Sequence, residues 1–554
     1  MDNSAYEAEV GEIKEDATAT QDSQLEAIIV RIGDFGRFQM RNYVLLCLPI
    51  ICSTFHSLSF VFTASTASYR CFIGDCDTEN SSFIEPWLNF TIPRSDDDWD
   101  QCNQYQSIGV GCDADTFNSS QIVSCESGYK LMDDDGSIAT EFGIYCSNQW
   151  QLSMVGTVSF IAHIVGMPMG GYFSDRYGRK ATLVVAGVLS AITGLARSHT
   201  VGYYSFLLLE FLSMFVGSPL FYIALLLAVE LVGCKQRVLF GMIISLTYAV
   251  AEVALGYLAS LIRNWRVLLR VIYTPALLHL LFICYMSESV RWLLSQSREL
   301  EAVDILRDVA IVNQRQVNER ELSDMVRHNR KVISQTRAAG GHYTARQIYN
   351  ALGHRTATCC GLWLIIVFIS MGLTLNSMEL YGDKYRNFGL SGLVKLPGVV
   401  FAMLLMNRLG RRWTLNLCMG TCSISLLLMV ALINEYPTVS WHLFFLAQMA
   451  NIGSHMVLIF FTAELFPTSC RSSLLALCYM IGRIGAMLAP SAQLLISYYK
   501  YTPHLLFAAL GIPSSVLSML LPETSNETLP TTMEQACALD LHSSRKSSVS
   551  HSTG

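Results

Sequence analysis

Charged residues are scarce in this sequence. Asp, Glu, Lys and Arg make up 15% of the 554 residues, whereas soluble proteins carry about 25%. Apolar residues make up 52% of the chain, and the mean hydropathy is positive. A chain with so little charge is predicted to cross a lipid bilayer several times. The net charge of −6 says little by itself, because the positions of the charges matter more than their sum.

Catalytic motifs and a cleavable leader are also missing. The sequence contains no P-loop, no metal-ligand spacing and no nucleophile elbow, so we expect no enzyme activity, no metal and no cofactor. A nucleic-acid partner is not expected either. The first forty residues are polar and acidic, without the apolar core of a signal peptide. The amino terminus is therefore expected to stay in the cytosol.

Apolar segments long enough to span a membrane recur along the whole chain. A helix of about 20 apolar residues crosses the roughly 30 Å hydrocarbon core of a bilayer. The predicted spans are 42–64, 150–172, 181–198, 203–229, 238–262, 266–285, 358–380, 391–407, 413–433, 440–463, 473–497 and 503–521. The predicted fold is an all-α integral membrane protein with twelve transmembrane helices in two sets of six.

Polar segments divide this series of spans. Lys and Arg gather in the turns at 174–180 and 234–237, which are therefore expected on the cytosolic side. The segment between the two sets of spans is expected to be cytosolic and largely helical, and its middle (298–336) to be a solvated linker. The predicted parts are a cytosolic segment 1–41, a six-helix half 42–285, a cytosolic loop 286–357, a second six-helix half 358–521 and a cytosolic tail 522–554.

A long polar insert at 65–149 separates the first two spans. It carries fifteen acidic and three basic residues. It also contains six cysteines (Cys71, Cys76, Cys102, Cys112, Cys125 and Cys146) and three N-x-S/T sequons (Asn80, Asn89 and Asn118). An even set of cysteines together with sequons predicts a disulfide-bonded, glycosylated extracellular loop. Six cysteines allow 15 pairings, so the connectivity stays open.

Two motifs occur twice. Gly170–Lys180 reads GGYFSDRYGRK and 407–412 reads NRLGRR, with Arg176 lying 232 positions before Arg408. Similarly, ELVGCKQR begins at Glu230 and ELFPTSCR begins at Glu464, 234 positions later. Two independent motifs at nearly one spacing indicate an internal duplication. Transporters are often built in this way, as two six-helix halves.

These motifs carry a family resemblance. The pattern G-x-x-x-D-R-x-G-R-K resembles the loop signature of the major facilitator superfamily. The lead-in GDFGRFQ at 33–39, the large cysteine-bearing loop, SESVRWLL at 287–294 and LPET at 521–524 resemble the organic cation, organic anion and carnitine transporters within it. Ser287 and Val290 replace two prolines of the family motif. The resemblance covers residues 33–524 and implies alternating access around a central site.

The resemblance also implies a conformational role for the repeated motifs. Asp175 and Arg179 are expected to pair with Glu230 in a cytosolic ion cluster that closes the inner gate and breaks when the carrier opens inward. The second half is expected to repeat this cluster in weaker form, because Asn407 stands in the place of Asp175. The expected gating set is Asp175, Arg176, Gly178, Arg179, Glu230, Arg237, Arg408, Arg411, Glu464 and Arg471.

Ionisable residues inside the spans are the candidates for binding substrate, because burying them is costly. Arg483 lies twelve residues after Arg471, near mid-bilayer. A guanidinium facing a water-filled cavity binds a carboxylate in bidentate fashion. In the resembling family this position tends to carry Asp in cation carriers and Arg in anion and carnitine carriers. The alternative is that Arg483 pairs with Glu252 or another buried acid for packing alone.

The other candidates are less decisive. Lys395 would add a second positive charge, or its amino group would reach the outer interface. His163 would be a second ligand or a packed histidine. Glu210 stands where relatives often carry Arg. A site that combined Glu210 and Glu252 with the two cations would suit a zwitterion. Aromatic residues of the spans, among them Tyr222, Tyr248, Trp363 and Tyr381, would stack on an organic cation or simply pack. The candidate binding set is Arg483, Lys395, Glu252, Glu210, His163 and Tyr248.

The predicted function is transmembrane transport of small organic ions. Organic anions or zwitterions, carnitine-like or derived from amino acids, are the expected substrates. Two alternatives remain: an organic cation transporter that uses Glu210 or Glu252, and a non-transporting membrane sensor on the same fold. The expected surroundings are a small-molecule substrate and the lipid bilayer, in the plasma membrane and with both termini cytosolic. The sequence leaves the coupling ion and the oligomeric state open.

Overall fold

The computed structural model describes most of the chain. The described residues are 31–33, 36–66, 68–78, 81–95, 98–125, 127–132, 136–232, 237–315, 345–467, 470–497, 499–525, 530 and 535–536. Within these residues, twelve helical spans are long and apolar enough to cross a membrane. The predicted number and order of spans are therefore confirmed.

The first half of the molecule contains six spans. They are formed by α2 (Arg37–Thr63), α5 (Trp150–Tyr177), α6 (Arg179–Arg197), α7 (Tyr203–Gly217) with α8 (Pro219–Glu230), α9 (Arg237–Leu261), and α10 (Trp265–Tyr273) with η4 (Thr274–Leu281) and α11 (Phe282–Tyr285). Pro219 begins α8 and divides the fourth span, because proline has no N–H to continue the helical bonding.

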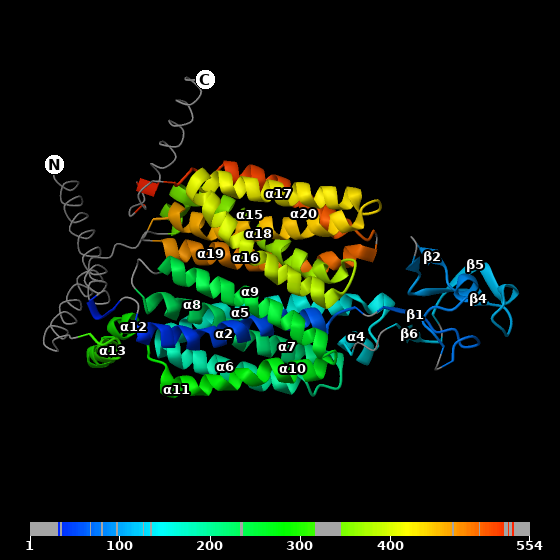
Figure 1. The fold of residues 1–554 in the computed structure, drawn as a ribbon, viewed down its shortest axis with the longest axis horizontal. Coiled ribbons are helices and arrows are strands. Elements are labelled where there is room, and N and C mark those ends of the chain that lie inside the picture. Colours follow the sequence, from blue (N-terminus) through cyan, green and yellow to red (C-terminus); the bar gives the residue numbers. More distant parts are fainter. Residues whose placement is uncertain are drawn as a thin grey trace, which may run out of the picture.

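The second half repeats this arrangement. Its spans are α15 (Ala345–Asn376), α16 (Lys384–Leu409), α17 (Arg411–Leu432), α18 (Pro437–Leu465), α19 (Arg471–Ala492) with η6 (Gln493–Ser497), and α20 (Thr502–Met519); η5 (Ser377–Glu379) follows α15. In Figure 1 the two halves lie against one another, with the helices running along the long axis. An apolar core crosses their boundary and includes Phe60 and Leu255 of the first half with Trp363 and Phe388 of the second.

The turn after α5 is shorter than predicted. The sequence pattern predicts a tight turn over the polar stretch that ends at Lys180, but α5 continues to Tyr177 and α6 begins at Arg179. Only Gly178 lies between them, with φ +106°. Gly410 has φ +85° at the equivalent place between α16 and α17. Glycine adopts this backbone conformation without the steric cost that a Cβ brings.

The cysteine-rich insert forms a small β domain at one end of the bundle. Its antiparallel pairs are β1 (Tyr69–Cys71) with β6 (Tyr129–Leu131), β2 (Arg94–Ser95) with β3 (Asp98–Trp99), and β4 (Asn103–Ser107) with β5 (Phe117–Ser124). Short helices α3 (Leu88–Thr91), η1 (Ala114–Thr116), α4 (Ile138–Glu141) and η2 (Cys146–Asn148) complete it. Figure 1 shows this domain beyond the helix ends, and we call this end of the molecule the outer end.

All six cysteines of the insert are paired, which confirms the predicted disulfide-bonded loop. The bonds are Cys71–Cys125, Cys76–Cys112 and Cys102–Cys146. The last bond ties β4 to the segment that leads into α5. Asn89 is exposed and Asn118 is half-exposed, so both sequons are open to solvent, whereas Asn80 lies outside the described residues.

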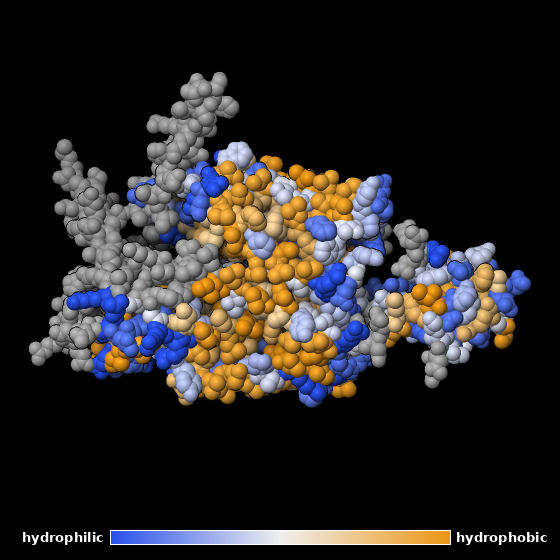
Figure 2. Space-filling view, in the orientation of Figure 1, coloured by the Kyte–Doolittle hydropathy of each residue, from blue (hydrophilic) through white to orange (hydrophobic). Residues whose placement is uncertain are grey.

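Two short helices lie at the opposite end, which we call the inner end (Figure 1). They are α12 (Val290–Ser295) and α13 (Glu299–Val312). Leu306 and Val309 of α13 pack with Trp292 of α12 and with Phe38 at the start of α2. The expectation of a solvated linker is therefore wrong for α13, because its apolar face is buried. Figure 2 shows the hydrophobic surface of the bundle between the more polar ends.

Candidate functional site

A cluster of charges joins the inner ends of three spans in the first half. The Arg179 guanidinium at the start of α6 lies 3.0 Å from an Asp175 oxygen and 3.5 Å from a Glu230 oxygen. The Glu288 carboxylate accepts hydrogen bonds from the backbone N–H groups of Arg179 (3.0 Å) and Lys180 (3.2 Å). Glu288 therefore caps the positive end of the α6 dipole.

Burial raises the pKa of Glu288 above its ordinary value, although hydrogen bonds from the N–H groups of Ser289, Lys180 and Arg179 oppose that shift. The ring of Trp292 completes the contact, because its Nε1 donates to the Asp175 carbonyl oxygen at 2.8 Å. The segment after the sixth span is thus bound to the turn after the second.

The second half contains the same arrangement. Arg411 at the start of α17 donates from Nε and Nη2 to Glu464, each at 2.9 Å. Glu523 accepts from the N–H groups of Arg411 (2.9 Å) and Arg412 (3.0 Å). Thr524 adds a hydroxyl bond to Glu464 at 2.6 Å. The contact between Arg411 and Glu464 is closer than that between Arg179 and Glu230, contrary to the expectation of a weaker second cluster.

Other members of the expected gating set lie apart. Arg176 is exposed and donates to the Tyr172 hydroxyl at 2.8 Å, and Arg408 is exposed. The structure does not bring Arg471 to Glu464, because its guanidinium donates to the carbonyls of Phe466 (3.0 Å) and Pro530 (3.3 Å). The side chain of Arg237 lies outside the described residues.

Both clusters tie together elements of one half and do not bridge the two halves. The capping role of Glu288 and Glu523 was not predicted. Their signals were SESVRWLL and LPET, which the family resemblance matched without assigning a role to the acid.

Arg483 lies between the two halves. It projects from the middle of α19, and its Nη2 donates to the Tyr222 hydroxyl of α8 at 3.1 Å and also to the Tyr479 hydroxyl. Its guanidinium carbon lies 5.0 Å from the centre of the Tyr479 ring. The Nε atom is buried without a hydrogen-bond partner. The side chain is only partly buried even though it lies mid-span.

Lys395 and Glu252 form an ion pair across the two halves. The Lys395 amino group on α16 lies 2.7 Å from each carboxylate oxygen of Glu252 on α9. The Glu252 side chain is fully buried. Lys395 also donates to the Thr374 hydroxyl at 3.3 Å. Glu252 is therefore the partner of Lys395, and the alternative pairing of Arg483 with Glu252 is not found among the described contacts.

Glu210 is not brought to this site. Its carboxylate pairs with Arg197 of α6, and both side chains are fully buried. The Ser159 hydroxyl donates to Glu210, and Nη2 of Arg197 donates to Ser59 at 3.1 Å. The charge of Glu210 is thus satisfied inside the first half by an arginine on the neighbouring helix.

The two remaining candidates lie beside Arg483. His163 is 3% exposed, and its Nε2 lies 3.2 Å from the Ser57 hydroxyl. Tyr248 packs edge-on against Phe221, with ring centres 6.0 Å apart. Both lie within electrostatic reach of Arg483.

Aromatic rings complete the surroundings of Arg483. Tyr479 packs against Tyr222 and Trp363, with ring centres 5.0 and 5.4 Å apart. Trp363 meets His455 at 5.5 Å. Tyr479 and the placement of His455 were missed by sequence reasoning, although Tyr479 lies one helical turn before Arg483, a spacing that puts both on one face. Tyr381 is 84% exposed and lies outside the site.

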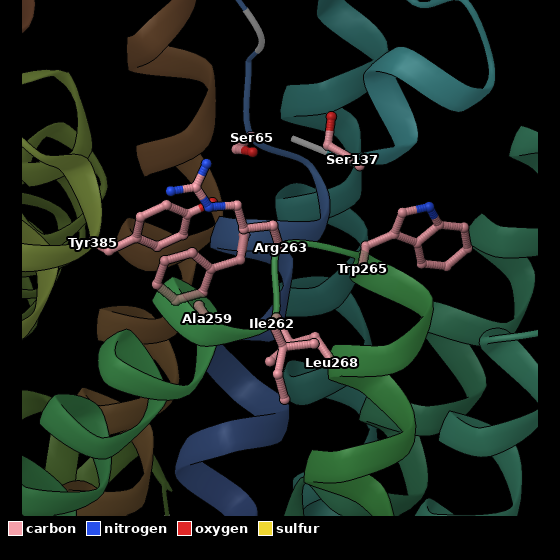
Figure 3. Close-up of a pocket in the computed structure, with 10 residues that line it drawn as sticks. Ser65, Ser137, Ala259, Ile262, Arg263, Trp265, Leu268 and Tyr385 are labelled. Carbon is pink, nitrogen blue, oxygen red and sulfur yellow. The ribbon is translucent and has the colours of Figure 1, made fainter. Parts of the chain in front are cut away.

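Aromatic packing closes the outer end between the halves. The Phe62 ring of α2 lies 4.8 Å from Phe388 and 5.8 Å from Tyr385, both on α16. A small pocket remains beside this contact, and Figure 3 shows Arg263 extending over it toward Tyr385. Thr66 donates to Glu379 at 3.3 Å across the same boundary.

Twelve spans in two repeated halves, matched inner ion clusters and a charged site at their boundary define a secondary transporter of the major facilitator type. The family described as "Sugar (and other) transporter" matches residues 112–535. In fold, the chain resembles the Escherichia coli xylose transporter XylE in a partially occluded inward open conformation, with a TM-score of 0.59, 14% identity, and coverage of 87% of this chain and 99% of that one.

Sequence relatives make the assignment narrower. The chain is 30% identical over 526 residues to Solute carrier family 22 member 7 of Rattus norvegicus, covering 92% of this chain and 97% of the rat protein. It is 28% identical over 533 residues to the Organic cation transporter protein of Drosophila melanogaster, covering 92% and 93%. The chain belongs to the solute carrier 22 family of organic ion transporters. It is a multi-pass membrane transporter, not an enzyme.

Proposed function

We propose that this protein transports small organic anions, or zwitterions bound through their carboxylate, by alternating access. Arg483 carries the proposal. It lies at the boundary of the halves, and within the described part of the chain its guanidinium donates to two phenol hydroxyls and to no carboxylate. Its Nε atom is buried and has no hydrogen-bond partner, so the guanidinium can donate hydrogen bonds to the carboxylate or sulfonate of a substrate.

The neighbouring charges support an anion. Lys395 and Glu252 neutralise one another, and Glu210 is neutralised by Arg197 away from the site. Arg483 therefore leaves the site with one excess positive charge. An organic cation would have to displace Lys395 or Arg197 from a buried carboxylate, which is costly. The names of the relatives do not choose between the two classes, because they include organic cation transporters.

The setting of this activity is the plasma membrane, with the cysteine-rich insert outside the cell. The insert has three disulfides, which form in oxidising compartments. The turn with Arg176, Arg179 and Lys180 lies at the inner end, as the positive-inside rule requires of a cytosolic turn. Both termini are then cytosolic. In the transport cycle, the halves would separate in turn at the outer aromatic contact and at the inner end.

Uptake by cells that express the protein tests this proposal. The panel contains an aromatic carboxylate, an aromatic sulfonate, a carnitine-like zwitterion and tetraethylammonium. Wild type should take up at least one anionic or zwitterionic compound, and Arg483→Ala should lose this uptake while reaching the surface normally. Arg483→Lys keeps the charge but not the planar fork, so it should lose about tenfold or more in kcat/KM, equivalent to about 1.4 kcal/mol.

Two other outcomes would overturn the proposal. Uptake of tetraethylammonium alone, unchanged in Arg483→Ala, would show a cation carrier. No uptake of any compound, with surface expression confirmed, would favour a sensor that has kept the fold.

A further inference from the structure

The ion pair between Glu252 and Lys395 lies in an unusual place. It joins α9 of the first half to α16 of the second, with two contacts of 2.7 Å. The carboxylate is fully buried and the lysine side chain is 10% exposed. The helices are close at this point, since a Cβ on Gly392 would lie 3.2 Å from the side chain of Glu252. The pair must therefore rearrange when the halves move apart along these helices.

One further cation, Arg483, lies within electrostatic reach of the groups around the pair, but its hydrogen bonds go to tyrosine hydroxyls and not to Glu252. The titratable groups that interact with the pair are Tyr248 on α9 and His455 on α18, and both also interact with Arg483 on α19, which is bonded to Tyr222 on α8. Glu252 is the one carboxylate among these described groups. Arg483 is already held by Tyr222 and Tyr479.

A bound anion changes the balance of this site. Its negative charge competes with Glu252 for Lys395, which is bonded to that carboxylate and shares the neighbour His455 with Arg483. A buried carboxylate that loses its cation is costly, and such a group takes up a proton instead of staying charged. Anion binding and protonation of Glu252 therefore favour one another, as linked equilibria must.

We propose that Glu252 carries a proton through the transport cycle, so that the protein moves an organic anion and H⁺ together in the same direction. This inference rests on the proposed anion function. On the outer side, Glu252 gains H⁺ from solution while Lys395 transfers its bond to the incoming anion. On the inner side, the anion leaves, Glu252 releases H⁺ and the pair with Lys395 re-forms. One monovalent anion and one proton cross per cycle, so the step carries no net charge.

Proteoliposomes that contain the full-length protein provide the test. The probe is labelled p-toluenesulfonate, which stays ionised between pH 5.5 and 7.4 and so does not partition through lipid as a neutral acid. The membrane voltage is clamped with potassium and valinomycin, and the outside is acidified. Wild type should accumulate the probe above its outside concentration, with a limit of about tenfold for each pH unit at 1:1 coupling. A proton ionophore should abolish the accumulation.

Three variants isolate the role of Glu252. Glu252→Gln, which keeps the shape but cannot exchange a proton, should still exchange labelled for unlabelled probe but should not accumulate it. Glu252→Asp should restore accumulation driven by the pH gradient. Thr374→Val removes the neutral partner of Lys395 and should keep the response to the gradient, which separates proton carriage from loss of packing around the lysine.

The outcomes separate this inference from the proposed function. Exchange that depends on Arg483, without accumulation by wild type in a pH gradient, would overturn proton coupling and leave anion transport standing. Accumulation by Glu252→Gln would show that another group carries the proton, and its loss in His455→Gln would identify that group. Absence of exchange by wild type would overturn both.

Discussion

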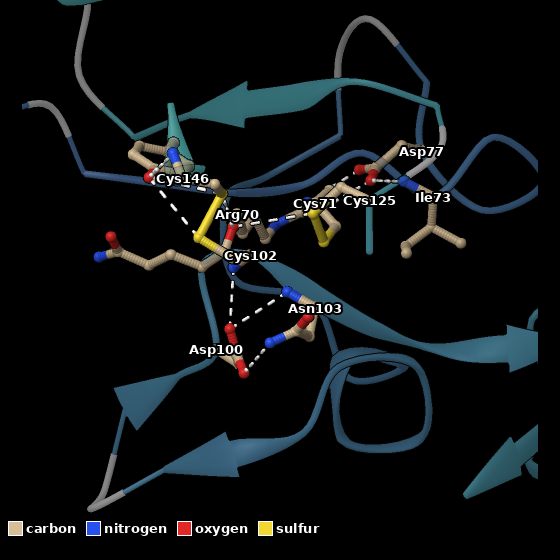
Figure 4. The surroundings of a disulfide bond; sticks show 11 residues. Arg70, Cys71, Ile73, Asp77, Asp100, Cys102, Asn103, Cys125 and Cys146 are labelled. Carbon is tan, nitrogen blue, oxygen red and sulfur yellow. Dashed lines mark hydrogen bonds and ion pairs between the residues drawn. A yellow bond between two sulfur atoms is a disulfide. The ribbon is translucent and has the colours of Figure 1, made fainter. Parts of the chain in front are cut away.

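Arg70 is a buried charged residue of the insert. It is 1% exposed, and its guanidinium donates to both oxygens of Asp77, at 2.6 and 2.8 Å. It also lies over the rings of Phe83 and Trp87, 5.6 and 5.2 Å from their centres. Figure 4 shows Arg70 among the disulfides of the insert. The pair fixes the fold of the insert around β1.

Removing the charge of Asp77 should destabilise the insert. Burial raises the pKa of Asp77, but hydrogen bonds from Arg70, the Ile73 N–H and Ser81 outweigh it, so the net pKa is lowered. Asp77→Asn leaves Arg70 buried without a counter-charge, at a cost of about 3–5 kcal/mol. We expect less protein at the cell surface and faster cleavage of the insert by an added protease. Asp75→Asn, at an exposed neighbour, is the control and should behave as wild type.

The dependence on pH follows from the lowered pKa. A carboxyl whose folded pKa is depressed stabilises the fold above its unfolded value of about 3.9, and that stability is lost as the pH falls through the folded value. Protease resistance of the wild-type insert should therefore be the same at pH 7.4 and 5.5. A marked loss of resistance at pH 5.5 that is absent in Asp77→Asn would contradict this account.

At the scale of single residues, the sequence predicted the candidate binding residues better than it predicted their partners. Burial cost alone pointed to Arg483, Lys395 and Glu252. It could not decide which cation Glu252 would face, because spacing along the chain does not determine which helices are neighbours. Glu210 was misplaced for the same reason, since its partner Arg197 comes from another span.

The repeated elements differ in how firmly their clusters are held. Glu464 contacts Arg411 through two nitrogens at 2.9 Å and also accepts from Thr524. Glu230 contacts Arg179 at 3.5 Å. Each cluster fixes the first turn of a span against the end of another, so it stabilises its own half.

Neutralising the two acids should therefore have unequal effects. Glu464→Gln loses charged hydrogen bonds worth about 1.5–3 kcal/mol each, whereas Glu230→Gln loses one longer contact. The midpoint of thermal unfolding of the purified protein should fall more for Glu464→Gln than for Glu230→Gln. Equal shifts, or a larger shift for Glu230→Gln, would show that the distances do not rank the two clusters. Arg408→Gln, at an exposed position of the same turn, serves as the control.

At the scale of elements, the twelve spans followed from hydrophobicity, but their ends and the soluble parts did not. The polar residues Asp175 and Arg176 predict a turn, yet α5 continues through them. Both side chains are exposed, and a helix can present charged side chains to water as readily as a turn can. The strand pairing of the insert and the docking of α13 depend on contacts between distant segments, such as Phe38 with Leu306. No local pattern encodes such contacts.

The molecule as a whole is closed at its outer end. Contacts between the halves there include Phe62 with Phe388 and Thr66 with Glu379. The inner ion clusters are formed at the same time, each within its own half. Alternating access requires the outer contacts to separate in every cycle while each half keeps its internal contacts.

A crosslink across the outer contact should therefore stop transport. Thr66 and Glu379 are exposed and 3.3 Å apart, so Thr66→Cys with Glu379→Cys should react with a short thiol crosslinker and reduce uptake to background. Glu141→Cys with Arg266→Cys, at a solvent-accessible ion pair inside the first half, should crosslink without stopping uptake. A cleavable crosslinker, removed by a mild reductant that leaves wild-type uptake intact, should restore transport. Full uptake with the first pair crosslinked would mean that the halves do not separate at this end, and that substrate enters by another route.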